Sequence, residues 1–70
     1  MEALQAFVAR FGLGISKEKL ISKAYFQLSH DGHDCCIING IYICVDGEEL
    51  QVIKSRRENR WIVKPLWGGR

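Results

Sequence analysis

The segment from Ile53 to Lys64 carries the most concentrated positive charge in the chain. It holds a single carboxylate, that of Glu58. Its five cations are Lys54, Arg56, Arg57, Arg60 and Lys64. Arginines on a β-ribbon can contact phosphate groups or enter a minor groove. The segment therefore predicts a nucleic-acid-binding hairpin tip, and an ordinary solvated turn is the alternative.

A second group of residues has the chemistry of a metal site. The side chains of His30, His33, Cys35 and Cys44 could surround a tetrahedral zinc ion. Their spacing lacks the C-x2-C knuckle of a zinc finger, and the adjacent Cys35 and Cys36 point to opposite faces of a strand. We therefore expect surface histidines and small apolar cysteines, with no metal and no cofactor.

The cysteines also raise the question of a disulfide. If Asn39-Gly40 forms a two-residue turn, Cys35 lies opposite Cys44 in a non-hydrogen-bonded pair, with Cα atoms about 4.5 Å apart. That distance is compatible with a disulfide. The amino-terminal residues do not resemble a signal peptide, and three cysteines cannot all pair. We therefore expect a cytoplasmic protein with three free thiols.

Turn signals and apolar runs predict the elements that hold these residues. Asn39-Gly40 and Asp46-Gly47 lie between apolar runs and predict tight hairpins. Helices are expected at about 2–12 and 16–29, strands at about 34–38, 41–45, 48–55 and 60–64, and a tail at 65–70. The fold class is α+β in a single domain, with two N-terminal helices packed on one face of a four-stranded antiparallel β-meander.

Periodicity and capping residues support both helices. Apolar residues recur at helical spacing in the first (Leu4, Phe7, Val8, Phe11) and in the second (Leu20, Ile21, Ala24, Tyr25, Leu28). Ser16 is the expected N-cap of the second helix. Lys17, Lys19 and Lys23 fall outside its apolar stripe, so we assign them to the nucleic-acid surface as well.

Two-residue turns at 39–40 and 46–47 and a four-residue turn at 56–59 divide the strand residues between two faces. The predicted core face comprises Cys36, Ile38, Ile41, Ile43, Val45, Leu50, Val52, Trp61 and Val63. The other face carries an apolar band of Ile37, Tyr42, Ile53 and Ile62. This band is the expected interface with a second copy or another protein, and Leu66 and Trp67 could cover either face.

Composition narrows the range of functions. The 70 residues carry a net charge of +2, and no apolar run approaches the roughly 20 residues that span a bilayer. The chain has no phosphate loop, nucleophile elbow or HExxH motif. We therefore expect no membrane association and no enzymatic activity.

Two known architectures share parts of this plan. Two helices followed by a basic hairpin resemble the order of a winged helix-turn-helix, in which the second helix enters the groove. Arg10 and Lys23 depart from that motif, and a winged helix has a third helix. The order of helices and meander is also similar to RelE-type messenger-RNA-cleaving toxins, although their first strand is absent. That similarity would make His30 or His33 a general base near the arginines.

The sequence thus predicts a small regulatory protein that binds nucleic acid through the cations of the hairpin and of the second helix. The alternative is a protein-interaction module that acts through the outer face or an edge of the sheet, as a homodimer or as an inhibitor of a larger partner.

Overall fold

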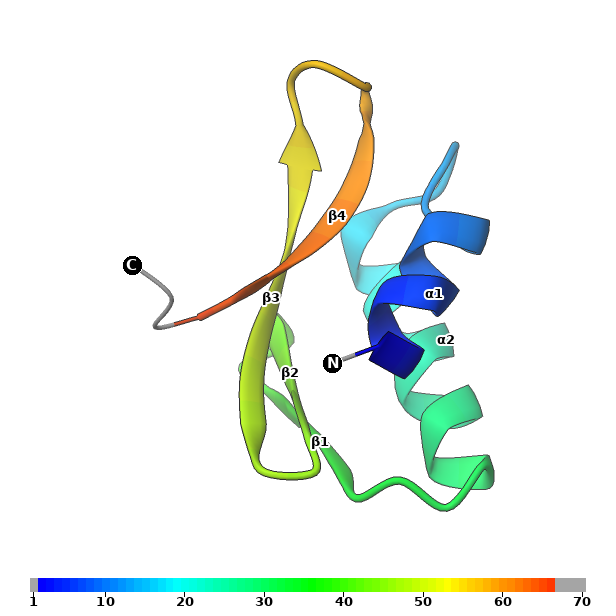
Figure 1. The fold of residues 1–70 in the computed structure, drawn as a ribbon, viewed down its shortest axis with the longest axis vertical. Coiled ribbons are helices and arrows are strands. Elements are labelled where there is room, and N and C mark those ends of the chain that lie inside the picture. The colour runs from blue at the N-terminus through cyan, green and yellow to red at the C-terminus, as the bar shows by residue number, and fades with distance from the viewer. Residues whose placement is uncertain (1, 67–70) are drawn as a thin grey trace.

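The computed structural model describes residues 2–66, and the prediction that Trp67 covers a face lies outside this range. Two helices are followed by four strands (Figure 1). The elements are α1 (Glu2–Phe11), α2 (Lys17–His30), β1 (Cys35–Ile38), β2 (Tyr42–Val45), β3 (Glu48–Ser55) and β4 (Arg60–Pro65). The strands form one antiparallel sheet in the order β1-β2-β3-β4. The predicted α+β meander is therefore confirmed.

Local capping sets the ends of α2. The Ser16 hydroxyl accepts a hydrogen bond from the Lys19 backbone N–H at 3.3 Å, as expected of an N-cap. At the other end, the Gly32 and His33 N–H groups donate to the carbonyls of Ser29 and Leu28. Gly32 has a φ of +94°, which this helix-closing motif requires. The chain thus leaves α2 directed toward β1.

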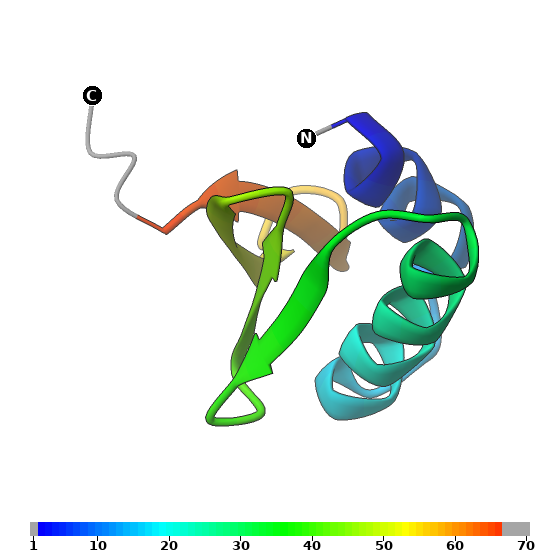
Figure 2. The same ribbon diagram turned by 90° about the horizontal axis from the view of Figure 1, so that it is seen from below.

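The core lies between the two helices and one face of the sheet. Both helices lie on the same side of the sheet, with α2 over β1 and α1 beside β4 (Figure 2). The fully buried residues are Leu4, Val8, Leu20, Ile21, Ala24, Leu28, Ile43, Val45, Leu50 and Val52. Tyr25 and Phe11 were expected in the apolar stripes, but they are 38% and 45% exposed, so these stripes are only partly buried.

Two of the three predicted registers are confirmed. Val45 pairs with Glu48 across the two-residue Asp46-Gly47 turn, in which both residues have positive φ. Ser55 pairs with Arg60, and Val52 pairs with Val63, across the four-residue turn. Pro65, predicted to begin the tail, is the last residue of β4 and pairs with Leu50.

The predicted register between β1 and β2 is wrong by one residue. Ile38 pairs with Tyr42, so three residues connect these strands, and Ile41 lies exposed in the turn. A shift of one residue reverses the faces of a strand. Cys35 and Ile37 consequently pack against the core, whereas Cys36 and Ile38 lie on the outer face.

No helix within residues 2–66 has both the length and the apolar character needed to cross a membrane.

Candidate nucleic-acid interface

The basic tip, the turn at residues 56–59, is carried by a ribbon of β3 and β4 that extends beyond the rest of the sheet. The residues of β3 that pair with β2 end at Gln51, whereas Val52–Ser55 pair with β4 alone. Within the turn, Asn59 donates its N–H to the Ser55 carbonyl at 3.0 Å, and Glu58 donates to the Ser55 hydroxyl at 3.3 Å. This closed turn leaves the side chains of Arg56 and Arg57 exposed.

The base of this ribbon is docked on the connection between the helices. The Trp61 backbone N–H donates to the Gly12 carbonyl at 3.1 Å, and its indole Nε1 donates to the Ile15 carbonyl at 2.7 Å. Gly12 is required here because a Cβ atom would collide with the Val8 carbonyl and lie 3.2 Å from that of Trp61. The tip therefore lies at the same end of the molecule as the start of α2 (Figure 1).

The predicted cations near the tip fall into two groups: those that are free to contact a ligand and those that contact other parts of the protein. Arg56, Arg57 and Lys19 are exposed, and Lys17 is half-buried, all at the end just described. Arg60 instead donates to the Ala9 carbonyl in the last turn of α1. The Lys54 ammonium lies 5.4 Å from the centre of the Trp61 ring. Arg60 and Lys54 thus help to fix the ribbon while their charges remain near the tip.

Lys64 and Lys23 lie away from the tip. Lys64 is paired with Gln51 in the part of the sheet that also includes β2. Lys23 lines a groove between the helices. That groove, of about 390 Å³, is lined by Phe7, Phe11, Ser22, Lys23, Phe26 and Gln27.

The groove contains a residue that the sequence analysis missed. Phe26 is 72% exposed, although its ring is large and apolar. The sequence pattern indicates this exposure, because Phe26 falls outside the apolar stripe of α2 and next to Lys23 in the helical repeat. A second hollow, which also contacts Phe11 and Lys23, continues past Lys19 to the start of α2. Cations and aromatic rings thus form one continuous track along the helices.

Carboxylates gather at the opposite end of the molecule. Asp31 caps α2, Asp34 lies in the following loop, and Asp46 occupies the β2–β3 turn. Glu2 and Glu48 line a shallow hollow there together with His33 and Asp46. In Figure 1 this end lies below, and the hairpin tip lies above. The charges of the chain are therefore partly separated, with Glu18 and Glu58 as the carboxylates that remain at the basic end.

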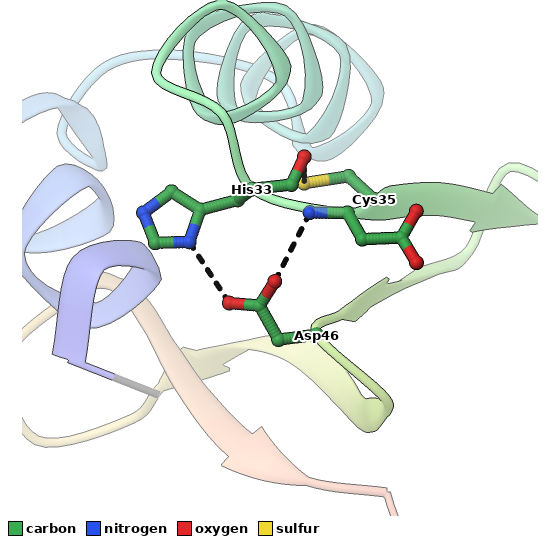
Figure 3. A network of polar contacts seen from close by, with 4 residues as sticks. His33, Cys35 and Asp46 are labelled. Carbon is green, nitrogen blue, oxygen red and sulfur yellow. Dashed lines mark hydrogen bonds and ion pairs between the residues drawn. The ribbon is translucent and has the colours of Figure 1, made fainter.

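The two predicted histidines lie at this acidic end. His33 Nδ1 is 2.8 Å from Asp46 Oδ2, and the Asp34 backbone N–H donates to Asp46 Oδ1 at 3.0 Å (Figure 3). These hydrogen bonds hold the pKa of the Asp46 carboxyl below its usual value, with the contact to His33 as the largest cause. His30 ends α2 and His33 lies in the loop that follows, at the opposite end of the molecule from Arg56 and Arg57 (Figure 1). The pairing of a histidine base with the tip arginines, implied by the similarity to RelE-type toxins, is therefore wrong.

The four residues considered for zinc do not come together. Cys35 faces the core, where its thiol lies 3.7 Å from the His33 carbonyl, whereas Cys44 belongs to the outer face (Figure 3). Burial raises the pKa of the Cys35 thiol. Among residues 2–66, no three histidine, cysteine or acidic side chains are close enough to hold a metal ion. The prediction that Cys35 lies opposite Cys44 is also wrong, because the register of β1 is shifted by one residue and Cys35 pairs with Val45.

The outer face of the sheet keeps its apolar band with one replacement. Tyr42, Ile53 and Ile62 lie on it and are half-buried. Ile37 was assigned to this band but packs against the core, and Ile38 takes its place opposite Tyr42. Both α1 and α2 lie on the other side of the sheet.

Comparison with known proteins leaves this site to be judged on its own geometry. No protein-family model, curated protein or solved structure matches the chain.

Proposed function

We propose that this protein is a non-enzymatic regulator that binds single-stranded nucleic acid in the cytoplasm. The observation that carries the proposal is the docking of Trp61 on the α1–α2 connection, at Gly12 and Ile15. Through it, Arg56 and Arg57 come to the same end as Lys17 and Lys19, while the carboxylates other than Glu18 and Glu58 lie away from this end. The free thiols of all three cysteines are consistent with a reducing compartment.

The charges at the two ends of the molecule would attract a nucleic-acid strand and orient it. Separated charge produces a field that draws a polyanion to the basic end and repels it from the acidic end. The first turn of α2 also favours negative charge through its backbone N–H groups, of which that of Lys19 is donated to Ser16, and Glu18 lies in the same turn. Phosphate contacts of this kind supply affinity that falls steeply with salt.

The aromatic track favours a single strand over a duplex. Unpaired bases stack on exposed rings, which contributes about 1–3 kcal/mol for each base. Phe26 and Phe11 are exposed, and Lys23 and Lys19 lie along the same track. Bases of a duplex are already stacked on each other, so they cannot use these rings.

Fluorescence anisotropy with labelled oligothymidine, oligouridine and a DNA duplex across a salt series tests the proposal. Wild type should bind the single strands more tightly than the duplex. The double variant Arg56→Gln/Arg57→Gln should reduce the magnitude of the salt slope by about 1.4, because each phosphate contact on a single strand contributes about 0.7. Arg60 is left intact because it contacts α1.

Two further variants locate the surface. Lys64→Gln removes the same charge from the sheet and should change the affinity less than Arg56→Gln does. Phe26→Ala should weaken binding to the single strands and leave the duplex unaffected. Absence of binding by wild type at low salt, or equal slopes for wild type and the double arginine variant, would contradict the proposal.

A second candidate function is homodimerisation through the outer sheet face. It is favoured by the apolar band of Ile38, Tyr42, Ile53 and Ile62, on the side of the sheet away from α1 and α2. Sedimentation equilibrium of wild type and Tyr42→Glu tests it. Wild type should dimerise and the variant should not, with Tyr25→Glu as the control on α2. A monomeric wild type would exclude this candidate.

A further inference from the structure

Cys36 and Cys44 lie directly opposite each other on neighbouring strands. Both are free thiols on the outer face, where Cys36 is exposed and Cys44 is half-buried. The third cysteine, Cys35, is on the other face of β1 and packs against the core. The sheet therefore separates one facing pair of thiols from a third thiol that cannot reach it.

The hydrogen-bond pattern defines the distance between the two cysteines. Asp46 donates its N–H to the Asp34 carbonyl at 2.8 Å, which makes Asp34 and Asp46 a hydrogen-bonded pair. Such pairs alternate along an antiparallel ladder, so Cys36 and Cys44, two residues further on, form another. The Cα atoms of such a pair are about 5.5 Å apart, within the range of 4.4–6.8 Å found for disulfides. A bond between them requires no change of register.

We propose that Cys36 and Cys44 form a reversible intrachain disulfide by exchange with a low-molecular-weight disulfide such as oxidised glutathione. The exposed Cys36 thiol loses its proton to solvent and attacks one glutathione sulfur, releasing the first glutathione thiolate. The Cys44 thiolate then attacks Cys36 Sγ and releases the second. Two protein thiols give up two electrons to the oxidised glutathione, and the two released thiolates take up the two protons.

The surroundings of Cys44 affect the second step of this exchange, in which Cys44 attacks Cys36 Sγ. Partial desolvation raises the pKa of the Cys44 thiol, and the neighbouring Cys36 and Glu49 raise it further. A raised pKa leaves less Cys44 thiolate at neutral pH, so this step should accelerate as the pH rises.

Because of the position of the pair in the sheet, the disulfide would join an edge strand to its neighbour and would be easily reduced. β1 is a four-residue strand at the edge of the sheet, and the bond would tie it covalently to β2. Side chains of a hydrogen-bonded pair are further apart than those of the alternate pair, so the disulfide carries some strain. Strained and exposed disulfides are those that reduce most readily.

Thiol counting with peptide mapping tests this inference. Native protein is incubated with excess oxidised glutathione, alkylated under denaturing conditions and analysed by intact mass and by peptide mapping. The three free thiols of the untreated chain should fall to one. Mapping should identify the remaining thiol as Cys35, and dithiothreitol should restore all three.

Single cysteine variants identify independently which two cysteines form the bond. Cys35→Ala should still form it, whereas Cys36→Ser and Cys44→Ser, substitutions on the outer face, should not. Because mapping is performed on wild type, a Cys35 variant that fails to fold leaves the test intact. Three thiols after oxidation, a bond that includes Cys35, or bonds only between chains would overturn the inference.

Discussion

The indole Nε1 of Trp61 donates a hydrogen bond to the Ile15 carbonyl at 2.7 Å and thereby joins β4 to the residues just before α2. These two residues are separated by 45 others in the chain, since the contact spans 46 positions. A second bond, from the Trp61 N–H to the Gly12 carbonyl, lies beside it. The position of the basic hairpin relative to the helices depends on this contact.

Replacing Trp61 by phenylalanine should therefore destabilise the fold. Trp61→Phe removes the donor to Ile15 and part of the ring, and we expect a loss of about 1–3 kcal/mol in the free energy of unfolding. Urea denaturation followed by far-ultraviolet circular dichroism measures it. The control is Phe26→Leu at a 72% exposed position, which should change stability by less than about 0.5 kcal/mol. Equal effects of the two variants would contradict a structural role for the indole.

Arg60 and Arg56 should respond differently to the same substitution. The Arg60 guanidinium donates to the Ala9 carbonyl at the end of α1, whereas Arg56 is exposed in the turn. Arg60→Gln should lower the free energy of unfolding by about 1 kcal/mol, and Arg56→Gln should change it by less than about 0.5 kcal/mol. Thermal or urea unfolding of the two variants gives the comparison. If Arg60→Gln proves as stable as wild type, its bond to α1 contributes nothing.

The stability of the fold should depend on Asp46 in acid. Hydrogen bonds from His33 and from the Asp34 N–H lower the pKa of this carboxyl in the folded state. Its stabilising contribution is therefore present above the unfolded value of about 3.9 and is lost as the pH falls through the folded pKa. Urea midpoints measured from neutral pH downward should fall less for Asp46→Asn than for wild type.

The matched control for this measurement is Glu48→Gln, an exposed carboxylate on the neighbouring strand. Asparagine suits position 46, because the φ of +50° there is accessible to asparagine at little cost. If Asp46→Asn loses stability below neutral pH as steeply as wild type, the contact with His33 does not contribute to acid stability.

The corrected register of β1 predicts a difference between two adjacent isoleucines. Ile37 packs against the core, whereas Ile38 lies on the outer face opposite Tyr42. Ile37→Ala should cost about 2 kcal/mol or more, and Ile38→Ala about 1 kcal/mol or less. Denaturant unfolding of both variants decides between the registers. A larger loss at Ile38 would favour the two-residue turn at Asn39-Gly40.

Local chemistry was sufficient to predict most of the fold. The Ser16 cap, the helical recurrence of Leu20 and Leu28, and the Asp46-Gly47 turn each act over a few residues. Such local interactions do not depend on the tertiary structure, so the sequence alone is enough to predict them. They determined the two helices, the order of the strands and the registers of β2–β3 and β3–β4.

Tertiary packing alone decided the register of β1. All four of its residues are apolar or thiol-bearing, so alternation carries no signal for which face is buried. The packing of α2 on β1, together with the hydrogen bonds that the Asp46 carboxylate accepts from His33 and from the Asp34 N–H, places Ile37 inside and Cys36 outside. Three residues then connect β1 and β2, and Cys36, rather than Cys35, faces Cys44.

The arrangement of charge was likewise a product of the tertiary structure. The sequence determined that Arg56 and Arg57 would occupy a turn and that Lys19 would avoid the core. Only the docking of Trp61 on Gly12 and Ile15 brings that turn to the start of α2. Contacts between residues so far apart in the chain depend on how the elements pack, and no local pattern in the sequence specifies that packing.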